Sequence, residues 1–242
     1  FGPFCADLGL AYDLRSSFTD CYFFFSQSVI TMRDVFSRQI VIDGKVVAVK
    51  SSLVFDASSL ALTGQQVKQL LQDPVTKSLK VSDVFLWDNA IDDVGFEALV
   101  DSPLSTRLQV LWMGHNKMTS DALCHLSHRL RDGAFRHIRD MFIDDNQIDD
   151  TGVFTLSTAC GDHGHLPQLR RLGLHTNLIT GLGASHIGRA LLLGTWPHLN
   201  TLWLHNNRIE RLGSLSAARN QRPSLRMTLQ DNPVTMGKTL QS

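Results

Sequence analysis

The feature of this sequence that most constrains its fold is an asparagine that recurs with the same apolar neighbours. Counting Asn207 as position 0, apolar residues occupy positions −8, −5, −3 and +2, and Gly213 occupies +6. With small departures, the pattern recurs around five further asparagines: Asn89, Asn116, Asn146, Asn177 and Asn232. Successive asparagines are separated by 27, 30, 31, 30 and 25 residues. The chain is therefore an array of repeats of nearly constant length.

Each repeat is predicted to be a short strand followed by a helix. Side chains alternate between the two faces of a strand, so positions −5 and −3 face the core and positions −4 and −2 face the opposite side. After position +6, apolar residues recur at helical spacing. The predicted helices cover residues 65–72, 95–100, 120–130, 151–159, 183–193 and 211–219. Because each unit buries its apolar face against its neighbours, the array predicts one α/β solenoid with a parallel sheet.

The consensus Leu-x-x-Leu-x-Leu-x-x-Asn-x-Ile-x-x-x-Gly over 28 or 29 residues resembles the leucine-rich repeats of the ribonuclease-inhibitor-like class. The resemblance is clear over residues 81–236 and extends back to residue 50. It implies a horseshoe with parallel strands on the concave face and helices on the convex face. It also implies an interaction scaffold, since this fold supports many partners. The asparagines are expected to be structural, because an amide can pair with backbone groups where a strand turns.

The two ends of the chain depart from the repeat pattern. Residues 1–50 are expected to form an N-terminal cap or degenerate repeat, with a β-hairpin near residues 38–50. There, two β-branched runs flank Asp43-Gly44, a pair that suits a two-residue turn. Residues 51–236 hold about six to seven repeats, and in the first of them Ser58 is expected at position 0. Residues 237–242 form a polar tail, and the first residue, Phe1, predicts a fragment or processed product.

The candidate functional residues lie at positions −4 and −2, on the predicted concave face. Their strand neighbours already fill the core positions, so these side chains are expected to be exposed and to bind a protein partner. The alternative is that the chain's own termini or neighbouring aromatic residues cover them. The candidate protein-binding residues are Phe85, Trp87, Trp112, Phe142, Asp144, His175, Trp203 and His205.

Charge on this face is uneven along the array. The acidic residues belong to the earlier and middle repeats, and basic or histidine residues follow. This division either orients a partner during association or is an incidental property of a solvated surface. The residues concerned are Asp83, Asp88, Asp140, Asp144 and Asp145, followed by Arg170, Arg171, His175 and His205.

Composition narrows the classes of partner and compartment. The formal net charge is zero, which disfavours nucleic-acid binding. No run of 18 apolar residues is present, so no membrane-spanning helix is expected. The four cysteines show no Cys-x-x-Cys spacing and the sequence lacks an Asn-x-Ser/Thr glycosylation site. An intracellular, cytoplasmic protein is expected, with cytoskeletal and ciliary locations as alternatives.

Motifs of enzymes and metal sites are missing from the sequence, so a non-catalytic chain without cofactor or metal is expected. It contains no Gly-x-Ser-x-Gly, no P-loop and no His-x-x-x-His zinc motif. Asp92-Asp93 and Asp149-Asp150 recur before helices, where acidic residues stabilise the helix N-terminus.

Two alternative functions stay open. One is a structural subunit of a large ciliary, cytoskeletal or ribonucleoprotein assembly, and the other is an activator resembling the Ran GTPase-activating proteins, although their acidic tail is absent.

Overall fold

The computed structural model describes residues 38–43, 45–49, 53–73, 76 and 80–236. Residues 37–242 form a compact unit distinct from residues 1–36. Most of the cap expected in residues 1–50, namely residues 1–37, 44 and 50, and the tail expected at 237–242 lie outside the described residues. Among the described helices, none is long and apolar enough to span a bilayer.

The unit is built on one sheet of nine strands that are ordered as they follow in the chain. Strands β1 and β2 form an antiparallel hairpin with Ile42 opposite Lys45, and β2 pairs antiparallel with β3. From β3 to β9 all pairs are parallel. The strands are Arg38–Ile42 (β1), Lys45–Val49 (β2), Val54–Asp56 (β3), Asp83–Phe85 (β4), Val110–Trp112 (β5), Asp140–Phe142 (β6), Arg171–Gly173 (β7), Thr201–Trp203 (β8) and Arg226–Thr228 (β9).

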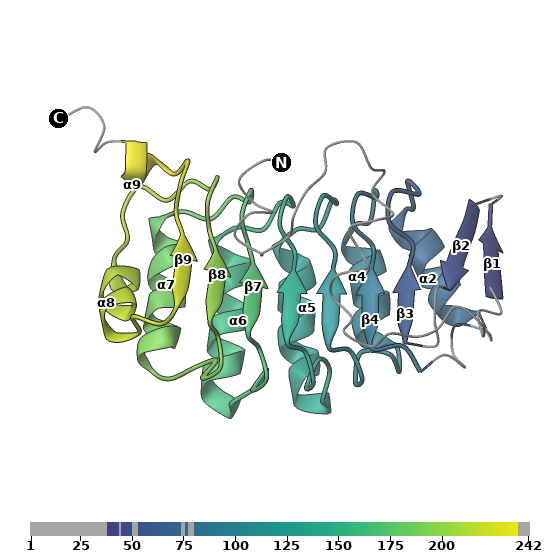
Figure 1. Ribbon diagram of the computed structural model, residues 1–242, viewed down its shortest axis with the longest axis horizontal. Coiled ribbons are helices and arrows are strands. Elements are labelled where there is room, and N and C mark those ends of the chain that lie inside the picture. Colours follow the sequence, from purple (N-terminus) through teal and green to yellow (C-terminus); the bar gives the residue numbers. More distant parts are fainter. Residues whose placement is uncertain (1–37, 44, 50–52, 74–75, 77–79, 237–242) are drawn as a thin grey trace. The chain divides into compact units, whose positions relative to one another are not determined.

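A helix follows each strand from β3 to β8, and these helices line one side of the sheet (Figure 1). They are Gly64–Gln72 (α2), Asp93–Asp101 (α4), Ser120–Arg129 (α5), Asp150–His163 (α6), Gly181–Leu192 (α7) and Ser214–Gln221 (α8), with a 3-10 turn, η2, over Leu130–Asp132 and a short helix, α9, over Pro233–Met236. Each helix packs on the helices of the neighbouring repeats. The predicted α/β solenoid with a parallel sheet is confirmed.

Two helix boundaries differ from those predicted by three residues or more. Helix α6 continues four residues beyond Ala159 and ends where Gly164 adopts a left-handed conformation (φ 64°), which suits a helix C-terminus. Helix α8 begins at Ser214 rather than Arg211, because Gly213 immediately before it has a φ of 50° and cannot belong to a helix.

The register of the first repeat also differs from the prediction. Val54 pairs with Asp83 at position −6 of the next repeat, so position 0 is Leu60 and not Ser58. Leu62 then occupies the buried +2 position, and Leu53, expected in the core, is 49% exposed. The prediction failed because Leu53, Phe55 and Leu60 imitate the core spacing two residues out of step. The corrected interval to Asn89 matches the repeat length of the later units.

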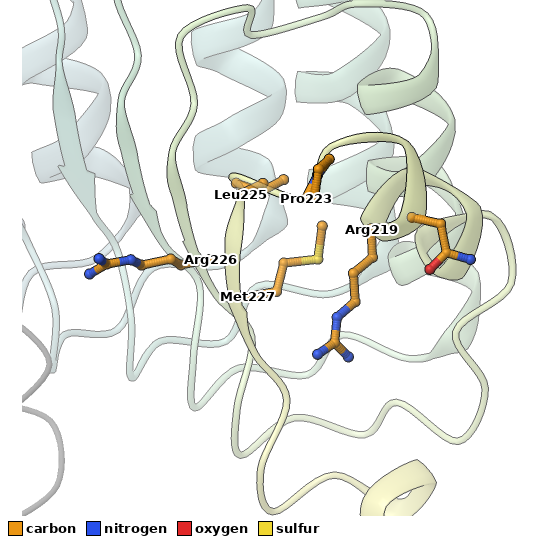
Figure 2. A pocket seen from close by; sticks show the side chains of 6 residues that line it. Arg219, Pro223, Leu225, Arg226 and Met227 are labelled. Atoms are coloured by element: carbon orange, nitrogen blue, oxygen red, sulfur yellow. The ribbon is translucent and has the colours of Figure 1, made fainter.

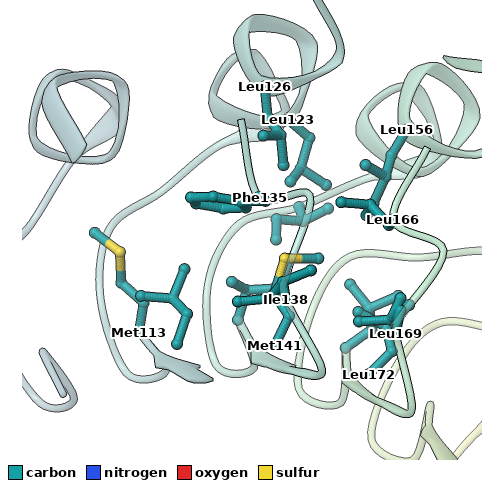
Figure 3. Packing of buried hydrophobic residues seen from close by; sticks show 14 of the residues in the cluster. Met113, Leu123, Leu126, Phe135, Ile138, Met141, Leu156, Leu166, Leu169 and Leu172 are labelled. Carbon is teal, nitrogen blue, oxygen red and sulfur yellow. The ribbon is translucent and has the colours of Figure 1, made fainter. Parts of the chain in front are cut away.

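The core fills the space between the sheet and the helices. Side chains at positions −8, −5, −3 and +2 pack against one stripe of each helix. Figure 3 shows this in the middle repeats, where Met141 and Ile138 lie beneath Phe135, and Leu172 and Leu169 lie beneath Leu166 and Leu156. Because every repeat contributes the same layer, the core is continuous along the sheet, and the strand residues between these positions are left for the opposite face.

The six asparagines at position 0 join each repeat to the one before it. Asn177 is representative: its Oδ1 accepts from the Ile148 amide (3.0 Å), and its Nδ2 donates to the carbonyl of Ile143 (3.1 Å), both in the preceding repeat. Equivalent bonds are made by Asn89, Asn116, Asn146, Asn207 and Asn232. These amides satisfy backbone groups at the turn where strand pairing has ended.

Acidic residues at the helix N-termini form a second set of bonds between repeats. Asp150 accepts from the amide (2.8 Å) and hydroxyl (2.6 Å) of Thr180 in the next repeat, and from the amide of Gly183. Asp93 makes the same pair of bonds with Thr119. These carboxylates therefore cap the neighbouring repeat's helix, a role more specific than the general charge effect expected from the sequence.

Candidate protein-binding face

We use the term open face for the side of strands β3–β9 that is opposite the helices. Its central feature is a row of aromatic side chains at position −4. Phe85 and Trp112 have ring centroids 5.8 Å apart, and Trp112 and Phe142 have centroids 5.0 Å apart. The row ends at Trp203, whose ring is 5.4 Å from that of Phe142. Parallel pairing in constant register brings these residues together, because it aligns position −4 of each strand with position −4 of the next.

Gly173 makes the last contact of this row possible. It occupies position −4 of β7, between Phe142 on β6 and Trp203 on β8. A Cβ atom at Gly173 would lie 2.8 Å from Cδ1 of Phe142, closer than such atoms normally approach. Because glycine has no side chain, the two flanking rings meet across the strand between them. The row is thus continuous over five strands although only four of them contribute rings.

The exposure of the aromatic row differs from the sequence prediction. Phe142 is 4% and Trp203 is 2% exposed, so the expectation that all five aromatic residues are exposed is wrong for these two. They are nevertheless outside the core cluster beneath the helices. Phe85, Trp87 and Trp112 are partly exposed. A partner that binds this face would therefore meet the β4 and β5 side chains first, and Phe142 and Trp203 would support them from within.

Asp144 lies at position −2, in the middle of the open face, and its side chain is 13% exposed. Gly114, two residues after β5 in the preceding repeat, makes room for it, since a Cβ atom there would lie 2.5 Å from Asp144 Oδ2. Nε2 of His175 lies 3.4 Å from the same oxygen, and the ring of His175 stacks on that of His205 with centroids 4.3 Å apart. All three are among the predicted protein-binding residues, and the structure brings them together.

Burial dominates the titration of this cluster. Removal from water, assisted by the charge of Asp145, raises the pKa of Asp144 to about 7. Burial, assisted by His205, lowers the pKa of His175 to about 3. His205 Nδ1 lies 2.9 Å from the Thr228 hydroxyl. At neutral pH His175 is thus uncharged and Asp144 is poised between its two forms, so the 3.4 Å contact is not a fully charged ion pair.

A neighbouring row of polar side chains was not predicted as a unit. It lies at position −1, where Asp88, His115 and Asp145 have φ between 47° and 57°. His115 Nδ1 contacts Asp145, and its Nε2 lies 3.4 Å from Asp88 Oδ1. The hydrogen bond that Asp145 accepts from the protonated ring raises the pKa of His115, and nearby aspartates add to this effect. The signal was present in the sequence, because Asp, Asn and His tolerate positive φ better than most residues.

Position −6 adds an ion pair between a buried aspartate and a partly buried arginine to the same face. Arg171 Nη2 donates to Asp140 Oδ2 (2.7 Å), and its Nε donates to the other carboxylate oxygen. Asp140 is 7% exposed, and the guanidinium carbon lies 5.8 Å from the centre of the Phe142 ring. Two parallel bonds of this kind hold both groups in fixed orientation. Acidic and basic residues that appeared as separate clusters in the sequence therefore neutralise each other here.

Among the residues that the structure describes, no group of three or more His, Cys, Asp or Glu side chains is arranged to hold a metal ion. The closest approach of such groups on the open face is the contact of His115 with Asp88 and Asp145.

Comparisons with known proteins give structural likenesses only. No family model and no curated protein matches the sequence. An internalin from Listeria monocytogenes aligns over 73% of this chain at 20% identity, with a TM-score of 0.42; this chain spans 38% of the internalin's length. A pollen receptor kinase 3 aligns over 80% of this chain and 77% of its own, at 16% identity and a TM-score of 0.42. Because both TM-scores are below 0.5, these likenesses do not establish the fold. The solenoid is established by the strand pairing and the repeated core of this chain.

Proposed function

We propose that this chain is a non-catalytic interaction scaffold, a horseshoe of the ribonuclease-inhibitor-like type, that binds a partner protein through the open face. The carrying observation is the aromatic row at position −4 together with Trp87 at position −2, because Phe85, Trp112 and Trp87 are partly exposed on the same face. Trp and Tyr side chains supply much of the energy in protein interfaces, because they bury a large area with few rotatable bonds. The period near 29 residues and the full helix in each repeat support the assignment to this type.

The chemistry around the two tryptophans favours a partner segment with basic and apolar side chains. Trp87 lies beside His115, with ring centroids 5.9 Å apart, and the Asp88 and Asp145 side chains that flank His115 are 41% and 47% exposed. An arginine or lysine that reached this edge would contact an aromatic ring and a carboxylate together. Such a contact fixes orientation and speeds association more than it strengthens binding.

The buried half of the aromatic row contributes stiffness. Trp112 rests on Phe142, Phe142 contacts both Trp203 and Arg171, and the Arg171 guanidinium is held by Asp140. Side chains fixed in this way lose little rotational freedom when a partner binds, which favours affinity. Phe142, Trp203 and the Asp144–His175–His205 cluster are therefore proposed to position the contact residues.

An intracellular location belongs to the same proposal. Cys124 and Cys160 are free thiols, and burial raises the pKa of the Cys160 thiol to about 12. A thiol of this kind is unreactive and packs as a small apolar side chain. Free thiols are common in proteins of reducing compartments.

The proposal is tested by affinity capture with quantitative mass spectrometry, using the wild type and two variants. The double variant Trp87→Ala/Trp112→Ala removes the contact residues. The matched control is Phe154→Ala, which removes a 46% exposed aromatic side chain from helix α6 on the other side of the sheet. We expect a protein that the wild type and Phe154→Ala retain and the double variant loses. If all three retain the same proteins, with circular dichroism showing intact folds, the open face is not the binding site.

A further inference from the structure

Strand β9 forms the end of the sheet that is distant from the hairpin, and within the described residues it pairs with β8 alone. Beside it, an open groove runs between the strand and the end of helix α8. The groove is lined by Arg219, Asn220, Pro223, Leu225, Arg226 and Met227. Figure 2 shows the Met227 side chain lying between those of Arg226 and Arg219. The groove is far along the sheet from Trp87 and is separate from the site proposed above.

The pairing of β9 with β8 determines which backbone groups point outward. Arg226 donates its amide to Asn200, and the Thr228 carbonyl accepts from Leu204, so both residues direct their backbone toward β8. In a parallel ladder the residue between them directs its N–H and C=O to the other side. Met227 therefore presents a donor and an acceptor to the outer edge, in the arrangement by which each earlier strand pairs with its successor. Such an edge is a template for a further strand.

The side chain of Met227 is also less covered than its equivalents. It occupies position −5, where Val84, Leu111, Met141 and Leu172 are at most 1% exposed. Met227 is partly exposed because no repeat follows to cover it among the described residues. With Leu225 and Pro223 it gives the groove an apolar wall, and methionine adapts well to different apolar partners.

Arginines make this end of the chain basic. Residues 181–230 contain six arginines and one glutamate, with no lysine or aspartate. Two of these arginines, Arg219 and Arg226, border the groove and are exposed, and neither forms an ion pair with a carboxylate of the described residues. Arg222, by contrast, is engaged, since it donates to the carbonyls of Trp196 and Leu199. The two bordering guanidinium groups favour an acidic ligand.

We propose that the β9 edge binds an extended acidic segment of a partner protein, in which apolar and acidic residues alternate. The segment pairs its backbone with Met227. Because side chains alternate along a strand, its apolar residues lie in the groove beside Met227 and Leu225, and its acidic residues lie on the open-face side beside Arg226. A second copy of this chain fits less well, since its own Arg226 would bring a like charge to the edge.

A defined peptide tests this proposal. The probe is a fluorescein-labelled peptide, Gly-Val-Glu-Val-Glu-Val-Glu-Gly, and its binding to the full chain is measured by fluorescence anisotropy. A peptide with lysine in place of each glutamate tests the charge, and Gly-Val-Val-Val-Glu-Glu-Glu-Gly tests the alternation at constant composition. We expect the alternating acidic peptide to bind at least about tenfold more tightly than either of the others. Loss of one favourable charge contact would weaken the binding of a peptide by about this factor.

Variants locate the site. Arg226→Glu should weaken binding of the acidic peptide by about tenfold or more, because a like charge replaces an opposite one. The matched control is Arg189→Glu, which makes the same charge change at an exposed position of helix α7 outside the groove. It should leave binding within about twofold, as should Trp87→Ala/Trp112→Ala. Failure here would therefore leave the proposed function of the open face untouched.

Amide exchange tests strand addition itself. Saturating acidic peptide should slow exchange of the Met227 amide, and the lysine peptide should not, because a hydrogen-bonded amide exchanges only when the ladder opens. Equal affinity for all three peptides, unchanged binding to Arg226→Glu, or an unprotected Met227 amide would each overturn the proposal. A concentration-dependent dimer that protects Met227 without peptide would overturn it in favour of a second copy.

Discussion

Replacing Asn177 with alanine should destabilise the fold strongly, and the contacts of Asn177 give the size of the effect. The side chain accepts one bond, from the Ile148 amide, and donates to the carbonyls of Ile143, Leu174 and His175. The three carbonyls keep another partner in the variant. The Ile143 carbonyl still accepts from Asn146 Nδ2 (3.3 Å), the Leu174 carbonyl from Asn207, and the His175 carbonyl from the Asp145 amide.

The remaining group, the Ile148 amide, loses its side-chain partner in a residue that is 0% exposed. An unsatisfied buried backbone group costs about 1–3 kcal/mol. We therefore expect Asn177→Ala to lower the free energy of unfolding by about 1–3 kcal/mol.

The assay is urea denaturation followed by circular dichroism at neutral pH, with the slope of the transition compared between variants. The control is Asn206→Gly, which removes an exposed asparagine with a single side-chain bond, to Thr176 (3.1 Å), at a position whose φ of 54° glycine accepts. It should lose less than about 1 kcal/mol. Equal losses in the two variants would refute the claim that the buried amide joins the repeats.

Three further predictions concern the open face. Asp144→Asn should stabilise the fold by about 4 kcal/mol at pH 8 and by nothing at pH 4. Burial raises the folded-state pKa of Asp144 to about 7, above its unfolded value, so the wild type loses stability as pH rises through this interval. An equal effect at both pH values in urea denaturation would contradict this. His115→Gln should lower the free energy of unfolding at pH 5.5 by about 0.2–1 kcal/mol, the range of exposed ion pairs. Because the folded-state pKa of His115 is raised, the difference from the wild type should vanish as pH rises above that pKa. The difference should also shrink in high salt. Gly173→Val should lower the free energy of unfolding by about 1–3 kcal/mol, because a Cβ atom would crowd Phe142. The same crowding should alter the near-ultraviolet circular dichroism of Trp203. An unchanged spectrum and an unchanged stability would show that the rings do not meet across β7.

The repeated part of the fold could be predicted from the sequence because its information is local. Each asparagine is accompanied by its own core residues, so one unit such as that around Asn207 predicts a strand, a turn and a helix without knowledge of the others. The error in the first repeat has the same origin. Where the asparagine is missing, Leu53, Phe55 and Leu60 match the pattern as well as the true register does, and only pairing with Asp83 decides between them.

The candidate site was less predictable because its properties depend on residues from different repeats. The alternation of the strand places Phe142 and Trp203 on the open face, but their burial depends in part on Gly173 in the repeat between them. Similarly, Asp144 appears as one acidic residue among several, and its titration follows from the space left by Gly114. A pattern read within one repeat does not contain these contacts.

The His115 row shows information that a comparison between repeats could have supplied. Position −1 is polar in the later repeats, as Asp88, His115, Asp145, Thr176 and Asn206 show. Ser59 extends the row, since its hydroxyl donates to Asp88 (2.9 Å). Comparing the same position along the array, as was done for the core positions, would have predicted a second row of side-chain contacts beside the asparagines.

The most direct test of the central claim is hydroxyl-radical footprinting of this chain in complex with a captured partner. Protection is read residue by residue from mass spectrometry of the free and bound chain. Trp87 and Trp112 should lose reactivity on binding, and Phe154, on the helical side, should keep it. Protection of Phe154 with unchanged reactivity of Trp87 and Trp112 would contradict the assignment of the open face as the binding site.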